Sequence, residues 1–219
     1  GGSGIKNYRY QVDDEPSFSS PWVKNGYTTN TYYTPNLAEG TYYWRVRARD
    51  NAGNNGDWTA AQQLIVDTTP PTVTVDIVDS SLNDADNSSE VTFEFSEEVA
   101  GFEVTDLTVV GGTISDFTQV DGDSYTATFT ANDGYDGTGS VTVNAGSYTD
   151  LAGNLGAEGS DNVDIDTLNP TVTNVTVNDT LITDADVGAG NFTVTVDFSE
   201  AMDTTVAPAI VFDPAVGGT

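Results

Sequence analysis

The chain has 219 residues, of which 37% are hydrophobic, a length that suits two or three domains with a modest core each. It carries 34 Asp or Glu and six Lys or Arg, all six basic residues precede residue 50, and the formal net charge is −28. This acidity argues against nucleic acid or an anionic membrane as a partner. The absence of Cys and His excludes disulfides and the usual nucleophile–base pairs, so we expect no enzyme.

The first 66 residues predict strands at 8–12 and 42–48 and a last strand that ends near Val66. In 42–48 the residues Tyr42, Trp44 and Val46 alternate with polar and basic residues, which is typical of a half-buried antiparallel strand. The run Leu37-Ala-Glu-Gly-Thr-Tyr-Tyr-Trp-Arg-Val-Arg-Ala48 resembles the second half of a fibronectin type III domain. The resemblance implies a partial domain at 1–66 without its first two strands, and strand phase selects Tyr42 as its corner tyrosine.

Aromatic residues of this first part have two alternative roles. They either pack in the core and between strands, or they line a sugar-binding surface. The residues concerned are Trp22, Tyr27, Tyr32, Tyr33 and Trp58.

A repeat divides the chain. Asp67-Thr-Thr-Pro-Pro71 returns as Asp166-Thr-Leu-Asn-Pro170, and Phe95-Ser-Glu97 and Asp84-Ala-Asp86 return as Phe198-Ser-Glu200 and Asp184-Ala-Asp186. Proline cannot donate to a ladder and forces extended geometry on the residue before it, so each motif marks a boundary. A period of roughly 100 residues predicts an elongated array of domains at 1–66, 67–166 and 167–219.

The middle module contains seven alternating runs and no helical periodicity, which is the strand count of an immunoglobulin-like β-sandwich. The runs are 72–78, 90–96, 105–110, 113–119, 124–130, 139–144 and 162–166. We predict that the apolar residues at alternate positions of these runs form the core: Val73, Val75, Val91, Phe93, Phe95, Leu107, Val109, Tyr125, Ala127, Phe129, Val141, Val143, Val163 and Ile165.

Several of these segments resemble the bacterial Ig-like repeats of very large secreted adhesins and biofilm proteins. The segments are Val91-Thr-Phe-Glu-Phe-Ser-Glu-Glu-Val99, Tyr125-Thr-Ala-Thr-Phe-Thr130, Ala145-Gly-Ser-Tyr-Thr-Asp-Leu-Ala-Gly-Asn154 and Asp164-Ile-Asp-Thr167. Residues 170–219 resemble the opening half of a related repeat, with its second strand in 192–202. The resemblance implies a non-catalytic structural segment of a secreted or cell-surface adhesin. Its partners would be the neighbouring domains, and calcium would stiffen the joints between them.

The topology of such a sandwich predicts where acidic residues gather. The chain start, the second loop and the last loop share the N-terminal pole, which brings together Asp67, Glu97 or Glu98, Asp150 and Asn154. The C-terminal pole collects Asp84, Asp86 and Asp166, with Asp133 and Asp136 beside them, and the next domain adds Glu200. Carboxylate and amide oxygens are the ligands that Ca²⁺ prefers, and without a cation these like charges repel one another.

Other interpretations of the acidic motifs stay open. Asp-x-Ala-Gly-Asn, which occurs at 50–54 and 150–154, is also an ordinary turn sequence, and the acidity also suits a solvated surface in a salty medium. The loop at 50–54 would serve a joint with a preceding domain. Residues 84–90 lack the central glycine and the distant glutamate of an EF-hand, so we reject that motif.

Two other functional classes use the same modules. A surface-layer, sheath or filament subunit would assemble through lateral or strand-complementing contacts with other subunits. A carbohydrate-binding or spacer region would accompany a secreted hydrolase. No apolar run in the sequence is long enough for a transmembrane helix, so we expect no membrane insertion in this segment.

Overall fold

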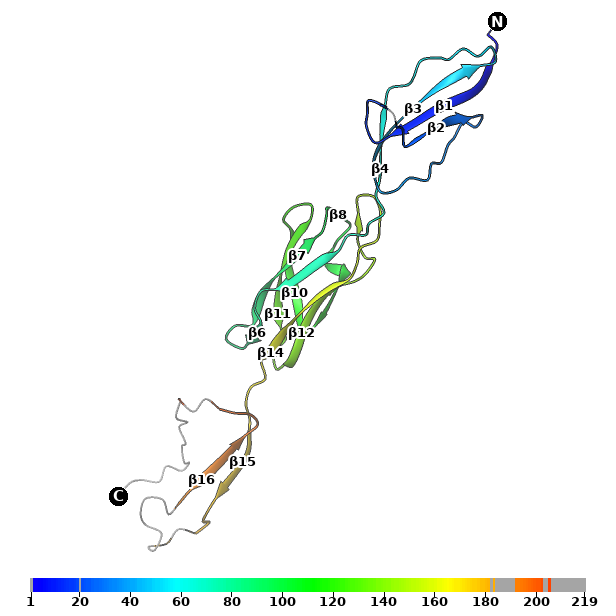
Figure 1. Ribbon diagram of the computed structural model, residues 1–219. Coiled ribbons are helices and arrows are strands. Elements are labelled where there is room, and N and C mark those ends of the chain that lie inside the picture. Colours follow the sequence, from blue (N-terminus) through cyan, green and yellow to red (C-terminus); the bar gives the residue numbers. More distant parts are fainter. Residues whose placement is uncertain (1, 20, 182, 184–191, 203–204, 206–219) are drawn as a thin grey trace.

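The computed structural model describes residues 2–19, 21–181, 183, 192–202 and 205, and three β-rich parts follow one another along an elongated shape (Figure 1). We call them the first unit (residues 2–66), the sandwich (67–166) and the third unit (167–202). Within the described residues the only helical element is a single 3-10 turn at Val104–Asp106, so the predicted all-β class is confirmed.

The first unit is one antiparallel sheet of four strands in the order β2-β1-β3-β4. The strands are β1 (Ile5–Asp13), β2 (Lys24–Thr28), β3 (Gly40–Asp50) and β4 (Gln62–Val66). The apolar pattern of the sequence does not predict β2, because Gly26 interrupts it. A larger residue here would have to displace the Tyr10 ring, since a Cβ at this position would lie 2.5 Å from the hydroxyl oxygen of Tyr10.

Tyr42 occupies the corner position that strand phase predicts. Its side chain is buried and its hydroxyl donates to the carbonyl oxygen of Ala38 at 3.0 Å, four residues upstream. Trp44 lies on the same face of β3 but is 41% exposed.

The aromatic residues of the first unit differ in how far they are packed, and sugar binding by them stays a prediction. Trp58 packs against basic side chains, with the guanidinium carbons of Arg45 and Arg47 at 4.7 and 4.5 Å from its ring centroid. Tyr33 stacks on Tyr10 at 3.8 Å between ring centroids. Tyr32, by contrast, is 71% exposed.

The sandwich contains all seven predicted strands in two facing sheets, in the orders β10-β11-β7-β5 and β6-β14-β12-β9. The longer strands are β5 (Val73–Ile77), β7 (Ser88–Phe95), β9 (Leu107–Val110), β10 (Gly112–Gln119), β11 (Ser124–Ala131), β12 (Asp136–Val143) and β14 (Gly159–Asp166). Short strands β6 (Ser81–Asn83), β8 (Val99–Ala100) and β13 (Thr149–Asp150) complete it. Apart from β6, which runs parallel to β14, this is the order of an immunoglobulin constant-type domain.

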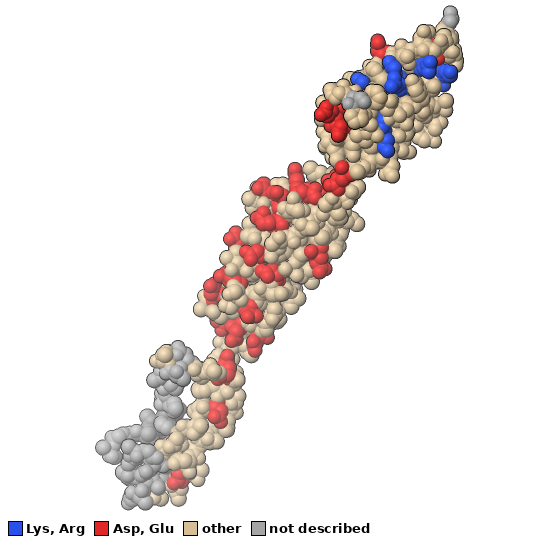
Figure 2. Space-filling model, in the orientation of Figure 1, with Lys and Arg blue, Asp and Glu red and all other residues tan. Residues whose placement is uncertain are grey.

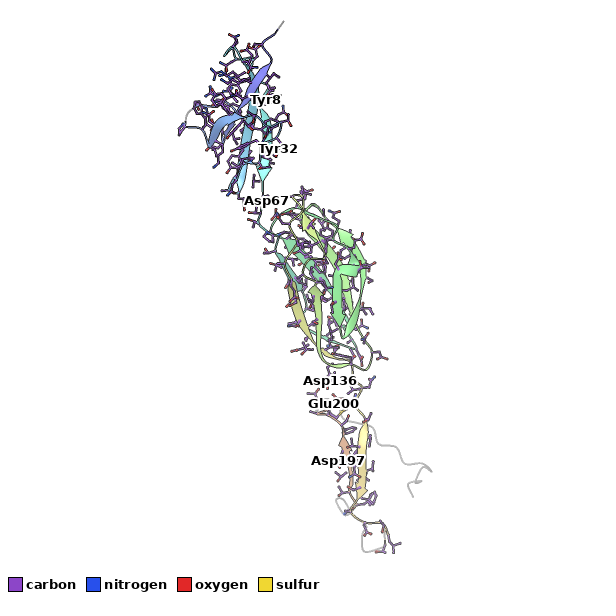
Figure 3. All side chains as sticks on the ribbon, turned by 90° about the vertical axis from the view of Figure 1, so that its right-hand side faces the viewer. Tyr8, Tyr32, Asp67, Asp136, Asp197 and Glu200 are labelled. Carbon is purple, nitrogen blue, oxygen red and sulfur yellow. The ribbon has the colours of Figure 1, made fainter. Side chains whose placement is uncertain are left out.

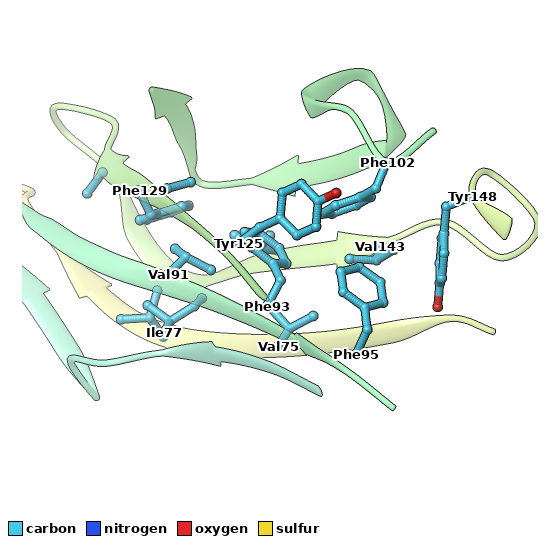
Figure 4. Close-up of a cluster of buried hydrophobic side chains, with 14 of the residues drawn as sticks. Val75, Ile77, Val91, Phe93, Phe95, Phe102, Tyr125, Phe129, Val143 and Tyr148 are labelled. Atoms are coloured by element: carbon cyan, nitrogen blue, oxygen red, sulfur yellow. The ribbon is translucent and has the colours of Figure 1, made fainter. Parts of the chain in front are cut away.

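The core lies between the two sheets (Figure 4). Every residue that the alternating runs assign to the core is buried in it or packs against it, and Val91, Phe93 and Phe129 have no exposed surface. Phe102 and Tyr148 are core residues that the alternating runs do not predict; they lie outside the long strands yet are 5% and 1% exposed. Their rings pack edge-on against core aromatic rings; the distance between the ring centroids of Phe95 and Tyr148, for example, is 4.9 Å.

The third unit has an antiparallel hairpin of β15 (Val172–Val177) and β16 (Val194–Phe198). Its start repeats the start of the sandwich. Thr171 and Ser199 exchange two hydrogen bonds, both at 2.9 Å, as Thr72 and Ser96 do at 3.0 and 2.9 Å. The repeated triplet at 184–186 and residues 206–219 lie outside the described residues.

Candidate metal centre at the first joint

The loop between β12 and β14 holds Asp150 in a fixed orientation. Asp150 is 2% exposed, and its two carboxylate oxygens accept hydrogen bonds from the backbone N–H of Asn154 at 2.8 Å and from the Asn154 side-chain amide at 2.7 Å. Gly153 has a φ of +93°, a conformation that glycine adopts without strain, and its N–H donates to the carbonyl oxygen of Asp150. This turn therefore places a buried carboxylate at the N-terminal pole.

The linker 67–71 is bound to the same pole. The side-chain amide of Asn154 donates to the carbonyl oxygen of Asp67 at 3.3 Å. The carbonyl oxygen of Pro71 accepts from the backbone N–H of Ala157 at 2.9 Å and from the hydroxyl of Tyr148 at 3.3 Å. These contacts hold the linker beside the loop that carries Asp150.

Three carboxylates meet at this joint, as the topology predicts. Asp67, Glu97 and Asp150 place one oxygen each within 4.8 Å of one another; Asp150 is buried and the other two are half-buried. Figure 2 shows acidic side chains where the first unit meets the sandwich, and Figure 3 marks Asp67 there. The cluster joins the linker, the loop after β7 and the loop after β12.

The donor set fits calcium. Ca²⁺ binds oxygens at about 2.3–2.6 Å, so two ligands of one ion lie up to about 5 Å apart, and the three carboxylates could reach a single ion with little movement. Mg²⁺ binds at about 2.0–2.1 Å and requires its ligands within about 4 Å. Carboxylates supply only part of the roughly six to eight ligands of Ca²⁺, which leaves room for carbonyl oxygens and water.

The electrostatics of the cluster favour a cation. Burial, followed by the charges of Asp67, Asp150 and Glu39, raises the pKa of Glu97. Burial opposes ionisation of Asp150, but the hydrogen bonds from Asn154, together with the backbone of Gly153 and Ala152, outweigh it and lower the pKa of Asp150. Because no Lys, Arg or His follows Arg49 in the sequence, neither the linker nor the sandwich supplies a basic side chain to neutralise the cluster.

The residues predicted for the second joint share a pole but do not form a comparable cluster. Asp166 lies opposite Asp136 in the β14–β12 pair and opposite Asn83 in the β14–β6 pair, and Asn83 exchanges backbone hydrogen bonds with Asp86. Glu200 and Asp136 lie near this joint (Figure 3). In the part of the chain that the structure describes, the first joint alone has three acidic oxygens so close together. Calcium binding by Asp84, Asp86, Asp166 and Glu200 stays a prediction.

Glu39 is the acidic residue that the sequence analysis missed. Its carboxylate accepts hydrogen bonds from the hydroxyls of Thr69 at 2.6 Å and Thr68 at 3.3 Å, beside Asp67. Its position follows from the register of β3 and β4 in the folded chain, which the sequence does not specify. Gly40 of β3 pairs with Val66 of β4, so the residue before Gly40 and the residue after Val66 are neighbours across the ladder.

The first unit also contains an uncharged groove of about 550 Å³ on the face of its sheet that carries Trp44. Side chains from β1, β3 and β4 line it, together with Thr28 of β2, residues 30–33 and Pro35. In the sandwich the corresponding apolar face of each sheet is covered by the other sheet.

In a comparison with protein families, residues 67–167 match the family described as "Bacterial Ig-like domain". This confirms the resemblance that the sequence shows for the middle of the chain. A comparison with curated proteins gives no match. Within the described residues, no helix has the length and apolar character needed to cross a membrane.

Proposed function

We propose that this chain is a non-catalytic structural segment of an extracellular adhesin, in which calcium stiffens the joints between β-sandwich domains. Such a segment projects a distal binding element from the cell surface. Bacterial Ig-like domains are commonly extracellular, which supports the proposed location. The observation that carries the proposal is the convergence of Asp67, Glu97 and Asp150 on the linker between two units.

The physical role of the ion follows from the position of the cluster. Asp67 belongs to the linker, whereas Glu97 and Asp150 extend from two loops of the sandwich. An ion held by all three would restrict the backbone rotations that let the first unit swing, because moving Asp67 would break its contact with the ion. Without the ion the same carboxylates repel one another and loosen the joint.

A thermal melt tests calcium binding. Melts of the whole chain in chelator, in calcium and in magnesium should show a calcium-specific stabilisation of about 2.7 kcal/mol at about 100 times the dissociation constant. For a sandwich of this size, that corresponds to a rise of roughly 10–20 °C in Tm. Glu97→Gln should abolish the rise, while Glu98→Gln, the same change at the adjacent exposed residue, should leave it intact. Coincident melts of the natural sequence would refute calcium stiffening.

The uncovered groove of the first unit favours a second candidate, a surface-layer, sheath or filament subunit. Trp44 is 41% exposed on a face that a second sheet or another subunit could cover. Light scattering over a wide range of protein concentration separates the two candidates. A projecting segment stays monomeric, whereas a lattice or filament subunit forms larger assemblies, and Trp44→Ser should dissolve them.

A further inference from the structure

The face of the first unit that lies opposite the groove carries a group of arginines. Tyr10 and Val46 line the groove, and side chains alternate between the two faces of a strand, so their neighbours along β1 and β3 lie on the other face. These neighbours include Arg9, Arg45 and Arg47, and the pairing of β1 with β3 sets Arg9 directly opposite Arg47. Figure 2 shows basic side chains on the surface of the first unit. Like charges that face each other across a ladder repel, so this arrangement needs a stabilising partner.

An indole ring holds the three guanidinium groups together. The ring centroid of Trp58 lies 5.8, 4.7 and 4.5 Å from the guanidinium carbons of Arg9, Arg45 and Arg47. An aromatic face attracts a cation, which offsets part of the repulsion among the three charges. Trp58 is half-buried, so the stacking fixes three guanidinium groups side by side.

Two further aromatic rings extend this face into solvent. The rings of Trp22 and Tyr27 lie 6.0 and 5.7 Å from the guanidinium carbon of Arg9, and the two residues are 37% and 52% exposed. The indole N–H of Trp22 donates to the carbonyl oxygen of Phe18 at 2.9 Å, which orients the ring. We call the whole set the arginine face: Arg9, Arg45, Arg47, Trp22, Tyr27 and Trp58.

The hydrogen bonds of these arginines orient them without neutralising their charge. The Nε–H of Arg9 donates to the side-chain oxygen of Asn25 at 3.3 Å, and the Nε–H of Arg45 donates to that of Gln11 at 2.8 Å. Both acceptors are neutral amides. The Nε of Arg47 is buried and has no hydrogen-bond partner.

The charges on this face act on one another. Burial, followed by the charge of Arg47, lowers the pKa of Arg45, and the charge of Arg9 adds to the decrease. The carboxylate of Asp13 acts in the opposite direction and does not cancel the decrease. An anion bound from solvent would relieve the repulsion that remains.

We propose that the arginine face is a binding site for an acidic sugar, that is, a saccharide unit that carries a carboxylate. A carboxylate accepts two parallel N–H bonds from a guanidinium group, and an arginine that is already held in place loses little entropy when it binds. The apolar C–H face of a sugar ring packs on exposed aromatic rings such as those of Trp22 and Tyr27. This inference goes beyond the proposed function and does not depend on calcium at the joint.

The distribution of charge along the chain limits the length of the ligand. The first unit contains all six basic residues and six of the 34 acidic residues, whereas residues 67–219 contain the other 28 acidic residues and no basic residue. At physiological salt, exposed charges more than about 8 Å apart are largely screened from one another. A short acidic oligosaccharide therefore meets mainly the arginine face, whereas a long polyanion such as nucleic acid also meets the acidic sandwich and is repelled.

Titrations of the whole chain in calcium-free buffer test the site. The probes are trigalacturonate, its methyl ester, which keeps the sugar rings without the charge, and citrate, which has carboxylates without a sugar ring. Calorimetry measures the affinity, and tryptophan fluorescence reports on the site because two of the three tryptophans belong to it. The variants are Arg9→Gln and Tyr27→Ser. The control Lys24→Gln removes the same charge from β2, where Lys24 pairs with Val12 on the groove side of the sheet.

The natural sequence should bind trigalacturonate at least about 10-fold more tightly than it binds the methyl ester or citrate. Arg9→Gln should weaken binding on the order of 10-fold, because it removes a charged hydrogen-bond donor. Tyr27→Ser should weaken it by about 3–10-fold through the loss of ring contact. This second variant changes an exposed ring and no charge, so it tests the site even where Arg9→Gln destabilises the first unit. Lys24→Gln should bind like the natural sequence.

Each contrary outcome has one meaning. The site is overturned by the absence of trigalacturonate binding at millimolar concentration, or by equal affinities of Arg9→Gln and Lys24→Gln. Equal affinities for trigalacturonate and citrate overturn the sugar half, and equal affinities for trigalacturonate and its methyl ester overturn the carboxylate half. Sedimentation velocity tests a competing occupant. Self-association that Arg9→Gln abolishes and trigalacturonate does not reverse would assign the face to acidic side chains of a second copy and overturn the proposal.

Discussion

The hydroxyl of Tyr148 ties the linker to the sandwich, and its removal gives a prediction that does not depend on a metal. The side chain is 1% exposed, and the hydroxyl donates to the carbonyl oxygens of Ala157 at 2.8 Å and Pro71 at 3.3 Å. Burial raises the pKa of Tyr148, so the hydroxyl stays protonated and remains a donor at neutral pH. Tyr148→Phe deletes these two contacts and keeps the ring against Phe95.

The expected loss of stability is about 1.5 kcal/mol. A buried hydrogen bond contributes about 0.5–1.5 kcal/mol, and an acceptor left without a partner adds to the loss. Pro71 keeps the 2.9 Å bond from the N–H of Ala157, so the shorter bond to Ala157 dominates the effect. For a domain of this size the loss corresponds to a decrease of about 6–12 °C in Tm.

The assay can separate the units of the chain. All three tryptophans, Trp22, Trp44 and Trp58, lie in the first unit, so tryptophan fluorescence follows that unit, and hydrogen exchange of the backbone amides of β7 and β12 follows the sandwich. In urea, Tyr148→Phe should shift the amide-exchange transition of the sandwich and leave the tryptophan transition in place. The control is Tyr135→Phe, which removes an exposed 3.1 Å bond to Thr138. Equal midpoints for the two variants would refute the role assigned to the buried hydroxyl.

Three further changes test the joint and the core. Because the pKa of Glu97 is raised above its ordinary 4.5, the stability linked to its protonation is present below that value and is lost as pH rises through the raised value. In chelator, Glu97→Gln should therefore stabilise the sandwich at neutral pH. Urea titrations between about pH 4 and 8 should show that the free energy of unfolding falls as pH rises for the natural sequence and for Glu98→Gln, but not for Glu97→Gln. Gly156→Ala would place a Cβ 2.2 Å from the Tyr148 ring and should destabilise by about 1–3 kcal/mol in urea unfolding; a loss near zero would mean that the ring is free to move. Phe93→Ala removes a ring with no exposed surface and should lower the free energy of unfolding by about 3–5 kcal/mol, and a loss below about 1 kcal/mol would contradict the core assignment.

The sequence predicts the sandwich well because strands impose a period of two on their side chains. Val91, Phe93 and Phe95 alternate with polar residues on β7, and their burial follows from the phase alone. Phe102 and Tyr148 fill the same core from outside the long strands. No periodicity applies to such positions, so only the packing of the folded chain identifies them.

The acidic cluster was partly predictable for a similar reason. The order of strands in an Ig-like sandwich fixes which loops share a pole, and this brought Glu97 and Asp150 to the linker. Glu39 required the register between β3 and β4, which the sequence does not specify. The repeat itself is also imperfect. Thr68 is exposed and bonds to Glu39, whereas Thr167, its counterpart at the second joint, is buried and donates to the carbonyl oxygen of Asn132 at 2.7 Å.

The two Asp-x-Ala-Gly-Asn loops make the same hydrogen bonds but lie in different surroundings, so comparing them shows which properties come from the motif and which from its position in the fold. Asn54 donates to Asp50 at 2.8 and 3.0 Å, Asn154 donates to Asp150 at 2.8 and 2.7 Å, and the pKa of each aspartate is lowered. In the described structure, only Asp150 also meets carboxylates from two other segments. The motif therefore specifies a turn, and the acidic cluster requires the convergence of loops and linker that the sandwich imposes. Glu97→Gln and a bound cation would both relieve the repulsion there, but only the cation would tie three segments together. Stability alone therefore cannot establish the function of this joint, and its stiffness must be measured.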